Sequence, residues 1–378
     1  MLLIRKLAPL MRKNNTRQLA KKSLKPNKME KLISGATPSN KQVHQETFRY
    51  ISPFPRINIR SDIYLRIKAA DVHEYPDANV LIAELHGGHV RNCPVALQVN
   101  VSEDERLINI DINKISNAPD FHCNLEIPIR SDLHVEAQDS VTVSNILSSE
   151  VKVKANKNID IKEVRADSVT LESAEGNIRC KGMLLGRVTR VETSKEGNMS
   201  FEKLQGDQLS CKTDGGNIST NSCYVEESRF VTNSGTLTLK NVHKKTEVDV
   251  QKGGTLNMTG VHGNLKVRAN GGKVSLQLSE LKDENFVKAN DVEQVLINIS
   301  DLIEEQSKIE VISSGIVLDD TLCHLNHGTS QNNTIFRNCN TAEAQSNLIV
   351  ESNGEVKLGK LSWVESLREQ LDAAGKSK

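Results

Sequence analysis

Two groups of histidine and cysteine residues carry side chains that could bind a metal ion. The first comprises His86, His89 and Cys93, and the second comprises Cys323, His324, His327 and Cys339. A structural zinc site needs four ligands that converge at about 2.0–2.3 Å, usually from tight turns. The first group offers only three ligands, and neither spacing matches a structural zinc motif. We therefore expect no metal site and no cofactor, with metal binding by either group as the alternative.

Paired carboxylates could supply the acid and base of a polysaccharide-cleaving enzyme. Asp319-Asp320 is an adjacent acidic pair in a plausible turn. The other acidic runs are Glu226-Glu227, Asp283-Glu284 and Glu304-Glu305. Polar turn residues usually face water, and a chain with one Trp and four Tyr has few rings on which sugars stack. We therefore expect a solvent-facing turn, no catalytic residues and no enzyme. A polysaccharide-acting β-helix enzyme is the alternative.

A repeat provides the elements that would position these side chains. Its turns are marked by Gly176, Glu196 or Gly197, Gly216, Gly235, Gly253 or Gly254, and Gly272, spaced by 18 to 21 residues. Apolar residues recur two and four positions after each turn and about five positions before it, with polar residues between them. Such alternation on both sides of a turn indicates two half-buried strands per unit.

Three columns of residues follow from this repeat. The first is Ile178, Met199, Ile218, Leu237, Leu256 and Val274; the second is Cys180, Phe201, Thr220, Leu239, Met258 and Leu276; the third is Leu171, Val191, Cys211, Phe230, Val248 and Val267. The alternation continues upstream at Leu133, Val135, Val141, Val143, Val151, Val153, Ile159 and Ile161, and downstream at Val311, Val317, Leu348, Val350, Val356 and Leu358.

A fixed period with two or three short strands per unit predicts a β-solenoid over residues 129–360. The fold class is therefore all-β: a single-stranded β-solenoid, right-handed or irregular, with about 19 residues per coil. In that fold Leu256 contacts Leu237 and Val274 in the neighbouring coils. The alternative is a β-sandwich of hairpins, in which Leu256 would contact only its hairpin mate near Val248.

Asparagine occupies one position in three successive turns, at Asn177, Asn198 and Asn217. Stacked Asn side chains can hydrogen-bond along a solenoid. This accounts for the Asn-x-Ser sequences at Asn198 and Asn217 without glycosylation.

The segments on either side of the repeat have a different character. Residues 46–128 contain alternating stretches such as 56–60 and 107–112, separated by turns with Pro76-Asp77 and Gly87-Gly88, and predict a small antiparallel β domain. The capping box Ser362-Trp-Val-Glu365 predicts a C-terminal capping helix over residues 361–378. Because both parts would cover the solenoid ends, we expect a monomer. A self-assembling structural solenoid is the alternative.

The repeated units resemble the putative adhesin family of β-solenoid domains. The resemblance rests on strand, Gly-Asn or Gly-Gly turn, strand units, as in residues 169–178 and 209–219, and covers roughly residues 130–360. That family is of unknown function, is common in bacteria and has a eukaryotic branch with a mitochondrial-type leader. The resemblance implies a binding surface and no catalytic residues.

Charge is unevenly distributed along the chain. The first 29 residues hold nine basic residues and no acidic one, which leaves 40 basic against 48 acidic residues, a net charge of −8, for the rest. An acidic body argues against nucleic acid as a partner.

The sequence has no apolar run of 18 residues, so no transmembrane helix is predicted. Seven cysteines without a CxxC pair indicate no disulfide framework.

The basic N-terminus has the pattern of a mitochondrial transit peptide. Leu3, Leu7, Leu10 and Met11 fall at helical spacing among basic residues. We expect residues 1–45 to be a transit peptide and disordered leader, with a plain disordered basic tail as the alternative. The sequence thus predicts a non-enzymatic mitochondrial β-solenoid that acts as an interaction or scaffold module for a protein partner.

The leader can be tested alone. Residues 1–40 fused to a fluorescent reporter should direct it to mitochondria and be cleaved, because acid-free amphipathic segments drive import. Imaging and immunoblotting of the fusion measure this, and a uniformly cytosolic, uncleaved reporter would contradict it. A fusion in which Arg5, Lys6, Arg12 and Lys13 are replaced by Gln is the control and should stay in the cytosol.

Overall fold

The computed structural model describes residues 41–88, 93–116, 120–322, 327–329, 334–337 and 344–361. These residues form β-strands almost throughout, with one short helix, α1 (Asp301–Gln306), and one 3₁₀ turn, η1 (Asp320–Leu322), among them. The all-β prediction is confirmed. Within these ranges no helix is long and apolar enough to cross a membrane. The transit-peptide residues 1–40 lie outside the described residues.

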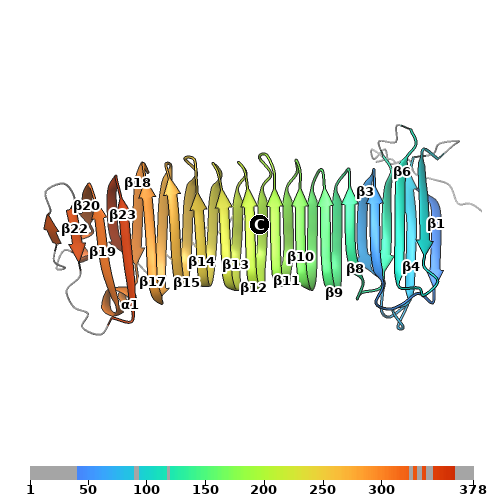
Figure 1. The fold of residues 1–378 in the computed structure, drawn as a ribbon, viewed down its shortest axis with the longest axis horizontal. Helices are drawn as coiled ribbons and strands as arrows, with labels where there is room; N and C mark the ends of the chain where they lie inside the picture. The colour runs from blue at the N-terminus through green and yellow to red at the C-terminus, as the bar shows by residue number, and fades with distance from the viewer. Residues whose placement is uncertain are drawn as a thin grey trace, which may run out of the picture. The chain divides into compact units, whose positions relative to one another are not determined.

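Long strands in parallel register make up the centre of the fold (Figure 1). They are β9 (Val141–Ala155), β10 (Ile159–Ser173), β11 (Ile178–Thr193), β12 (Met199–Thr213), β13 (Ile218–Thr232), β14 (Thr236–Val250) and β15 (Thr255–Asn270). Each pairs in parallel with the strand that precedes it and the strand that follows it. One such strand and its turn therefore form one coil of the predicted solenoid.

Burial along β10 shows how one strand makes a whole coil. Inward and outward residues alternate over 159–161, 164–166 and 169–173, and the alternation slips between these stretches. Glu163, at the first slip, has a φ of 50°, which bends the chain. Each coil thus has a first segment (159–162 in β10), a second segment (164–167) and a third segment (168–173), followed by a turn.

The three predicted columns of apolar residues are confirmed. Leu256 pairs with Leu237 on one side and Val274 on the other, and it is fully buried. Val248 pairs instead with Phe230 and Val267, in the column to which the repeat assigns it. These pairings exclude the hairpin sandwich. The columns join in one hydrophobic core that extends from Ile51 to Leu358.

The glycine column has a steric cause. A Cβ atom added to Gly216 would overlap the carbonyl oxygen of Gly197, and one added to Gly235 would overlap that of Gly216. These glycines are required because each turn lies directly on the previous one, where a side chain has no room. Gly215 differs, since the nearest atom to its added Cβ is the Ser234 hydroxyl at 3.5 Å.

Polar side chains join successive turns. The backbone N–H of Asn198 donates to Asn177 Oδ1 at 2.9 Å and that of Asn217 donates to Asn198 Oδ1 at 2.8 Å, which confirms the predicted Asn ladder. Thr213 Oγ1 donates to the Gly197 carbonyl at 3.1 Å and accepts from the Gly216 N–H at 3.1 Å. Buried turn hydroxyls thus satisfy backbone groups that would otherwise lack partners.

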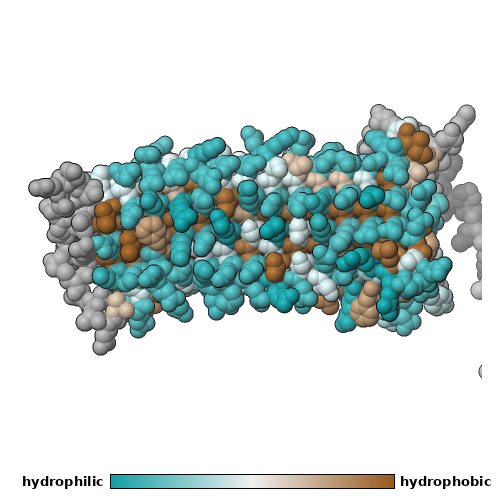
Figure 2. Space-filling view, viewed as in Figure 1, coloured by the Kyte–Doolittle hydropathy of each residue, from teal (hydrophilic) through white to brown (hydrophobic). Residues whose placement is uncertain are grey.

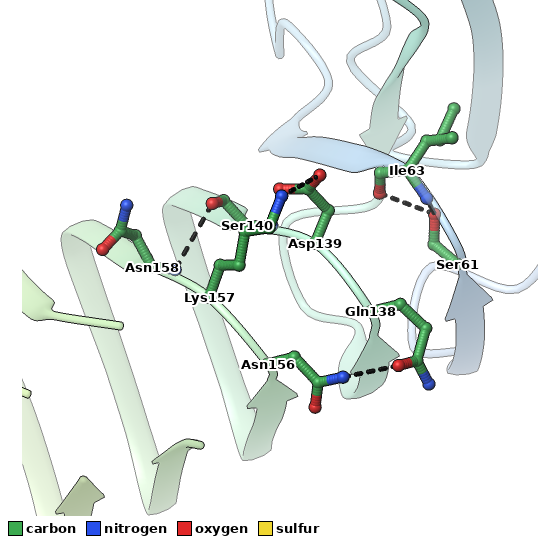
Figure 3. A network of polar contacts seen from close by, with 8 residues as sticks. All are labelled: Ser61, Ile63, Gln138, Asp139, Ser140, Asn156, Lys157 and Asn158. Atoms are coloured by element: carbon green, nitrogen blue, oxygen red, sulfur yellow. Dashed lines mark hydrogen bonds and ion pairs between the residues drawn. The ribbon is translucent and has the colours of Figure 1, made fainter. Parts of the chain in front are cut away.

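The turn that enters the central coils is held in the same way (Figure 3). Lys157 Nζ lies 2.8 Å from Asp139 Oδ2, and the Asn158 N–H donates to Ser140 Oγ at 3.3 Å. Each bond spans 18 residues, so it connects one coil to the next.

The N-terminal part is continuous with the solenoid. Its strands are β1 (Lys41–Arg49), β2 (Arg56–Ser61), β3 (Tyr64–Ala69), β4 (Val80–Gly87), β5 (Val95–Val101), β6 (Leu107–Lys114), β7 (His122–Ile127) and β8 (Asp132–Ala137). Strand β2 pairs in parallel with β6 and β8, and β3 with β7 and β9. Antiparallel pairs occur at β1–β4, β4–β7 and β5–β6.

Two sequence expectations for this part are corrected. The separate antiparallel domain over 46–128 does not form, because its apolar alternation matches that of the solenoid and β2 and β3 stack on it as a coil. The expected leader, residues 1–45, ends too late, because β1 begins at Lys41 and pairs with β4.

The C-terminal coils do not stack in sequence order. The strands are β16 (Lys273–Leu281), β17 (Asp283–Asn290), β18 (Gln294–Ile299), β19 (Ser307–Ser313), β20 (Gly315–Leu318), β21 (His327–Thr329), β22 (Thr334–Arg337), β23 (Ser346–Ser352) and β24 (Glu355–Lys360). Strand β23 lies between β17 and β19, and β24 lies between β18 and β20. The last coil is therefore inserted between two earlier ones.

An ion pair network secures this inserted coil. Lys360, at the end of β24, lies 2.9 Å from Glu304 and also pairs with Asp301, both in α1. Hydrogen bonds to Asp301 and then Glu304 raise the pKa of Lys360.

The expectation that Val317 faces the core is corrected. Its side chain is 46% exposed, while its neighbour Ile316 pairs with the buried Val356. The predicted capping helix over 361–378 lies outside the described residues apart from Leu361.

The turn stacking predicts a contrast between adjacent glycines. Gly216→Ala should lower the free energy of unfolding by about 1–3 kcal/mol, because the new methyl group overlaps the turn of the previous coil. Gly215→Ala should change it by no more than about 0.5 kcal/mol. Urea unfolding followed by circular dichroism measures both variants, and equal effects would show that the turns are not in contact.

Candidate functional site

The second segments of successive coils form an outward-facing row along the solenoid. Its members are Leu147, Arg165, Leu185, Gln205, Tyr224, His243, His262 and Glu280. The row is aliphatic and polar at first and then becomes aromatic over β13 to β15. This change singles out the aromatic part as a candidate site.

Tyr224, His243 and His262 form a continuous stack of rings, which we call the ring stack. The Tyr224 and His243 centroids are 4.4 Å apart with the planes at 19°, and those of His243 and His262 are 4.9 Å apart with the planes at 7°. These distances are close to the spacing of about 4.8 Å between neighbouring strands. The ring stack is therefore a direct product of the coil register, which places one ring above the next.

A groove of about 580 Å³ runs beside two of these rings. It is lined by Glu226, His243, Lys244, Lys245, His262, Gly263, Asn264, Glu280, Lys282 and Asp283. Lysine and glutamate pair along it: Lys244 with Glu226 at 3.3 Å, and Lys282 with Glu280 at 3.4 Å. Such exposed pairs contribute little to stability, so they are free to exchange partners with a ligand.

A second groove, of about 330 Å³, lies next to the first one. It is lined by Val188, Thr189, Arg190, Gln208, Leu209, Ser210, Glu227, Ser228, Arg229, Lys245 and Glu247. Lys245 belongs to both grooves and pairs with Glu227 at 3.1 Å. Val188 is 45% exposed and provides an apolar contact there. On the face shown in Figure 2, hydrophobic residues likewise form short rows within a hydrophilic surface.

Electrostatics within the ring stack favour the neutral imidazole. Burial, and then the neighbouring His262, lower the pKa of His243, while Glu280 opposes them. His262 Nδ1 lies 3.9 Å from Glu280 Oε2. A neutral His243 can both donate and accept a hydrogen bond from its ring edge. The site therefore presents aromatic surface, hydrogen-bonding ring edges and charges of both signs, which suits recognition of a polar chain.

The first candidate metal-binding group, for which no metal site was expected, is only partly within the described residues. His86 Nε2 lies 3.1 Å from Glu84 Oε2, and its ring stacks on that of His122 at 5.1 Å. Cys93 Sγ donates to the Val95 carbonyl at 3.3 Å. His89 lies outside the described residues. No cluster of three or more His, Cys, Asp or Glu side chains suited to a metal occurs where the structure describes them.

Most of the second candidate group lies outside the described residues. Cys323, His324 and Cys339 lie outside the described residues, and His327 begins the short strand β21. Asp319 and Asp320 are both exposed, as expected. Asp319 Oδ1 accepts from the N–H and the hydroxyl of Thr321 at 2.9 and 2.7 Å, and these bonds lower its pKa. Asp319 is thus part of a solvated turn.

Sequence reasoning missed the ring stack, although the sequence contains its signal. Tyr224, His243 and His262 are each 19 residues apart, which is the period of the repeat. Alternation identifies inward positions by their hydrophobicity, whereas outward positions carry no such mark. A search for ring-bearing side chains, Tyr and His together, at the repeat period would have found them. Two acidic runs considered for catalysis, at Glu226 and Asp283, instead contribute to the groove lining.

Comparison with known proteins extends the description. Residues 187–359 match the sequence model of the Toastrack DUF4097 family. A putative adhesin from Bacteroides fragilis is similar in structure, with 15% identity, a TM-score of 0.38 and an alignment over 60% of this chain and 99% of that one. A putative adhesin from Parabacteroides merdae has 11% identity, a TM-score of 0.36 and coverage of 84% and 96%. The matched segment is a β-solenoid domain similar to Toastrack domains, whose function is unknown.

The ring stack predicts two opposite shifts in one titration. His262→Gln should raise the pKa of His243, because it removes a neighbouring positive charge, and Glu280→Gln should lower it further. NMR titration of the His243 ring measures both. Neutral His243 favours folding above its ordinary pKa of about 6.5, and this contribution is lost as the pH falls through the lowered value. Shifts of the same sign in both variants would contradict the arrangement.

Proposed function

We propose that this protein is a non-enzymatic scaffold of the mitochondrion, and that the groove beside the ring stack binds an extended segment of a protein partner. The ring stack is the observation that carries the proposal. Aromatic residues are enriched at protein interfaces because they bury a large area at low entropic cost. The ring stack, two of whose rings line the groove, provides such an area on a mainly polar surface.

The dimensions of the groove suit an extended chain. Its two ring spacings, 4.4 and 4.9 Å, place the three rings over a length comparable to about three residues of extended peptide. The Lys244–Glu226 and Lys282–Glu280 pairs that line the groove offer partners for charges of either sign. A segment of mixed charge with an aromatic or aliphatic anchor would complement these features.

The chemistry of the grooves supports binding over catalysis. Glu226 and Glu280 are each paired with a lysine, and Asp319 lies in a solvated turn. A general acid in a glycosidase needs a raised pKa, whereas the bonds from Thr321 lower that of Asp319. A glycan-cleaving activity of the purified protein that is abolished by Asp319→Asn would overturn the non-enzymatic assignment.

The mitochondrial part of the proposal rests on the basic leader. Its nine basic residues, absence of acid and apolar residues at helical spacing support import. The partner should accordingly be sought in that compartment.

Proximity labelling tests the binding site. The full-length chain fused to a biotin ligase is expressed in cells, and the biotinylated proteins of intact mitochondria are identified. The double variant Tyr224→Ala, His243→Ala should lose at least one protein that the native chain labels. The control is Thr238→Ala, Asn257→Ala, two adjacent outward residues on the first segments of β14 and β15, which should leave labelling unchanged.

The labelling comparison requires that both variants fold as well as the native chain. Thermal unfolding of the purified variants checks that both fold as the native chain does. If both folded variants label the same proteins as the native chain, the groove is not the binding site.

A further inference from the structure

Strand β5 is an open edge of the solenoid. Among the described residues it pairs only with β6, in antiparallel register from Val95 opposite Lys114 to Val101 opposite Ile108. Natural proteins usually protect such edges with charges, prolines or bulges. Strand β5 carries none of these, because its sequence, VALQVNV, has no charged residue and no proline and its register is regular.

The other edge at this end of the solenoid is protected. Strand β1 pairs only with β4 among the described residues, and its register is interrupted by an irregularity between Gln42 and His44. It also carries Lys41, Glu46 and Arg49. Within the described part of the chain, β1 is therefore a protected edge and β5 is an unprotected one.

The backbone groups of β5 that face outward can be identified. The Ser102 N–H donates to the Leu107 carbonyl at 2.9 Å, and the Ile115 N–H donates to the Pro94 carbonyl at 2.8 Å. Because hydrogen-bonded and non-bonded pairs alternate in an antiparallel ladder, the even residues of β5 bond to β6. The N–H and C=O groups of Val95, Leu97, Val99 and Val101 therefore point toward the open side.

The side chains of β5 leave part of the core uncovered. Leu97, Val99 and Val101 pack against the main core but remain only half-buried, and they stand opposite the fully buried Ile112, Ile110 and Ile108. Gln98 and Asn100 point the other way and are exposed. One more strand beside β5 would complete the burial of these three apolar residues.

We propose that β5 pairs with β5 of a second copy of this chain, in antiparallel orientation about a two-fold axis at Gln98. This register overlaps the whole strand, places Val95 opposite Val101 and Leu97 opposite Val99, and joins all outward backbone groups in about eight hydrogen bonds. Apolar residues then meet apolar residues on the core side, and no charge is brought against a like charge. The apolar columns continue from one copy into the other.

Self-complementarity favours a second copy over an unrelated strand. The odd positions of β5 are all apolar, so the strand matches its own reverse. A two-fold contact uses the same patch on both chains and closes on itself. The product is a dimer, in contrast to the monomer expected from sequence, because the N-terminal strands cover only part of this end.

Charges placed at the axis test the proposal. Gln98→Lys and Gln98→Glu each put two like charges directly opposite one another, which destabilises the pair. Sedimentation of the purified full-length chain should give the mass of a dimer, and each variant alone should give the mass of a monomer. An equimolar mixture of the two variants should recover the dimer, because opposite charges then meet. A native chain that sediments as a monomer would overturn the proposal, including the case in which residues 1–40 cover β5.

A backbone variant tests the same contact independently. Val99→Pro removes an N–H that points to the open side without removing a bond to β6. It should abolish the dimer, whereas Val99→Ala keeps the N–H and should retain it. Far-UV circular dichroism verifies that both variants fold. A folded Val99→Pro variant that is still dimeric would place the contact elsewhere and reject the proposal.

Discussion

Direct stacking of each turn on the turn before it is the constraint on which the rest of this structure depends. The carbonyl oxygen of Gly197 occupies the space that a side chain at Gly216 would need, and the relation repeats at Gly235. Contact between the turns fixes the register of the strands that leave them. That register then sets the apolar columns inside, the Asn ladder at the turns and the ring stack outside. A single steric requirement thus governs both the core and the surface.

The sequence contains enough information to predict the centre of the fold because that centre is periodic. The 18- to 21-residue spacing of glycines places Leu237, Leu256 and Val274 in one column, and the structure pairs them. Prediction failed where strands do not pair in the order in which they occur in the sequence. Strands β2 and β3 pair with residues 76 positions later in the sequence. Local alternation cannot reveal such long-range pairing. Val317 was assigned inward by alternation, but the adjacent Ile316 faces the core.

The candidate site was harder to predict than the fold for a physical reason. Inward positions must be apolar, so the repeat marks them, whereas water accepts almost any outward side chain. Tyr224, His243 and His262 become a site only when the register brings each ring within 5 Å of the next one. The histidine and cysteine groups that attracted attention in the sequence are close along the chain. In a solenoid, however, residues one repeat period apart in the sequence lie next to each other on the surface.

The inserted C-terminal coil affects how the molecule can be assembled. Residues 307–318 are made before residues 346–360, yet they pair with those later residues, which separate them from β17 and β18. Until β23 and β24 are made, β17 to β20 lack the parallel neighbours that the described strands provide on that side. Strands β17 to β20 must therefore complete their parallel pairing in one late, cooperative step rather than coil by coil. For a chain threaded N-terminus first through a pore, this region would finish folding only after translocation had delivered its final strand.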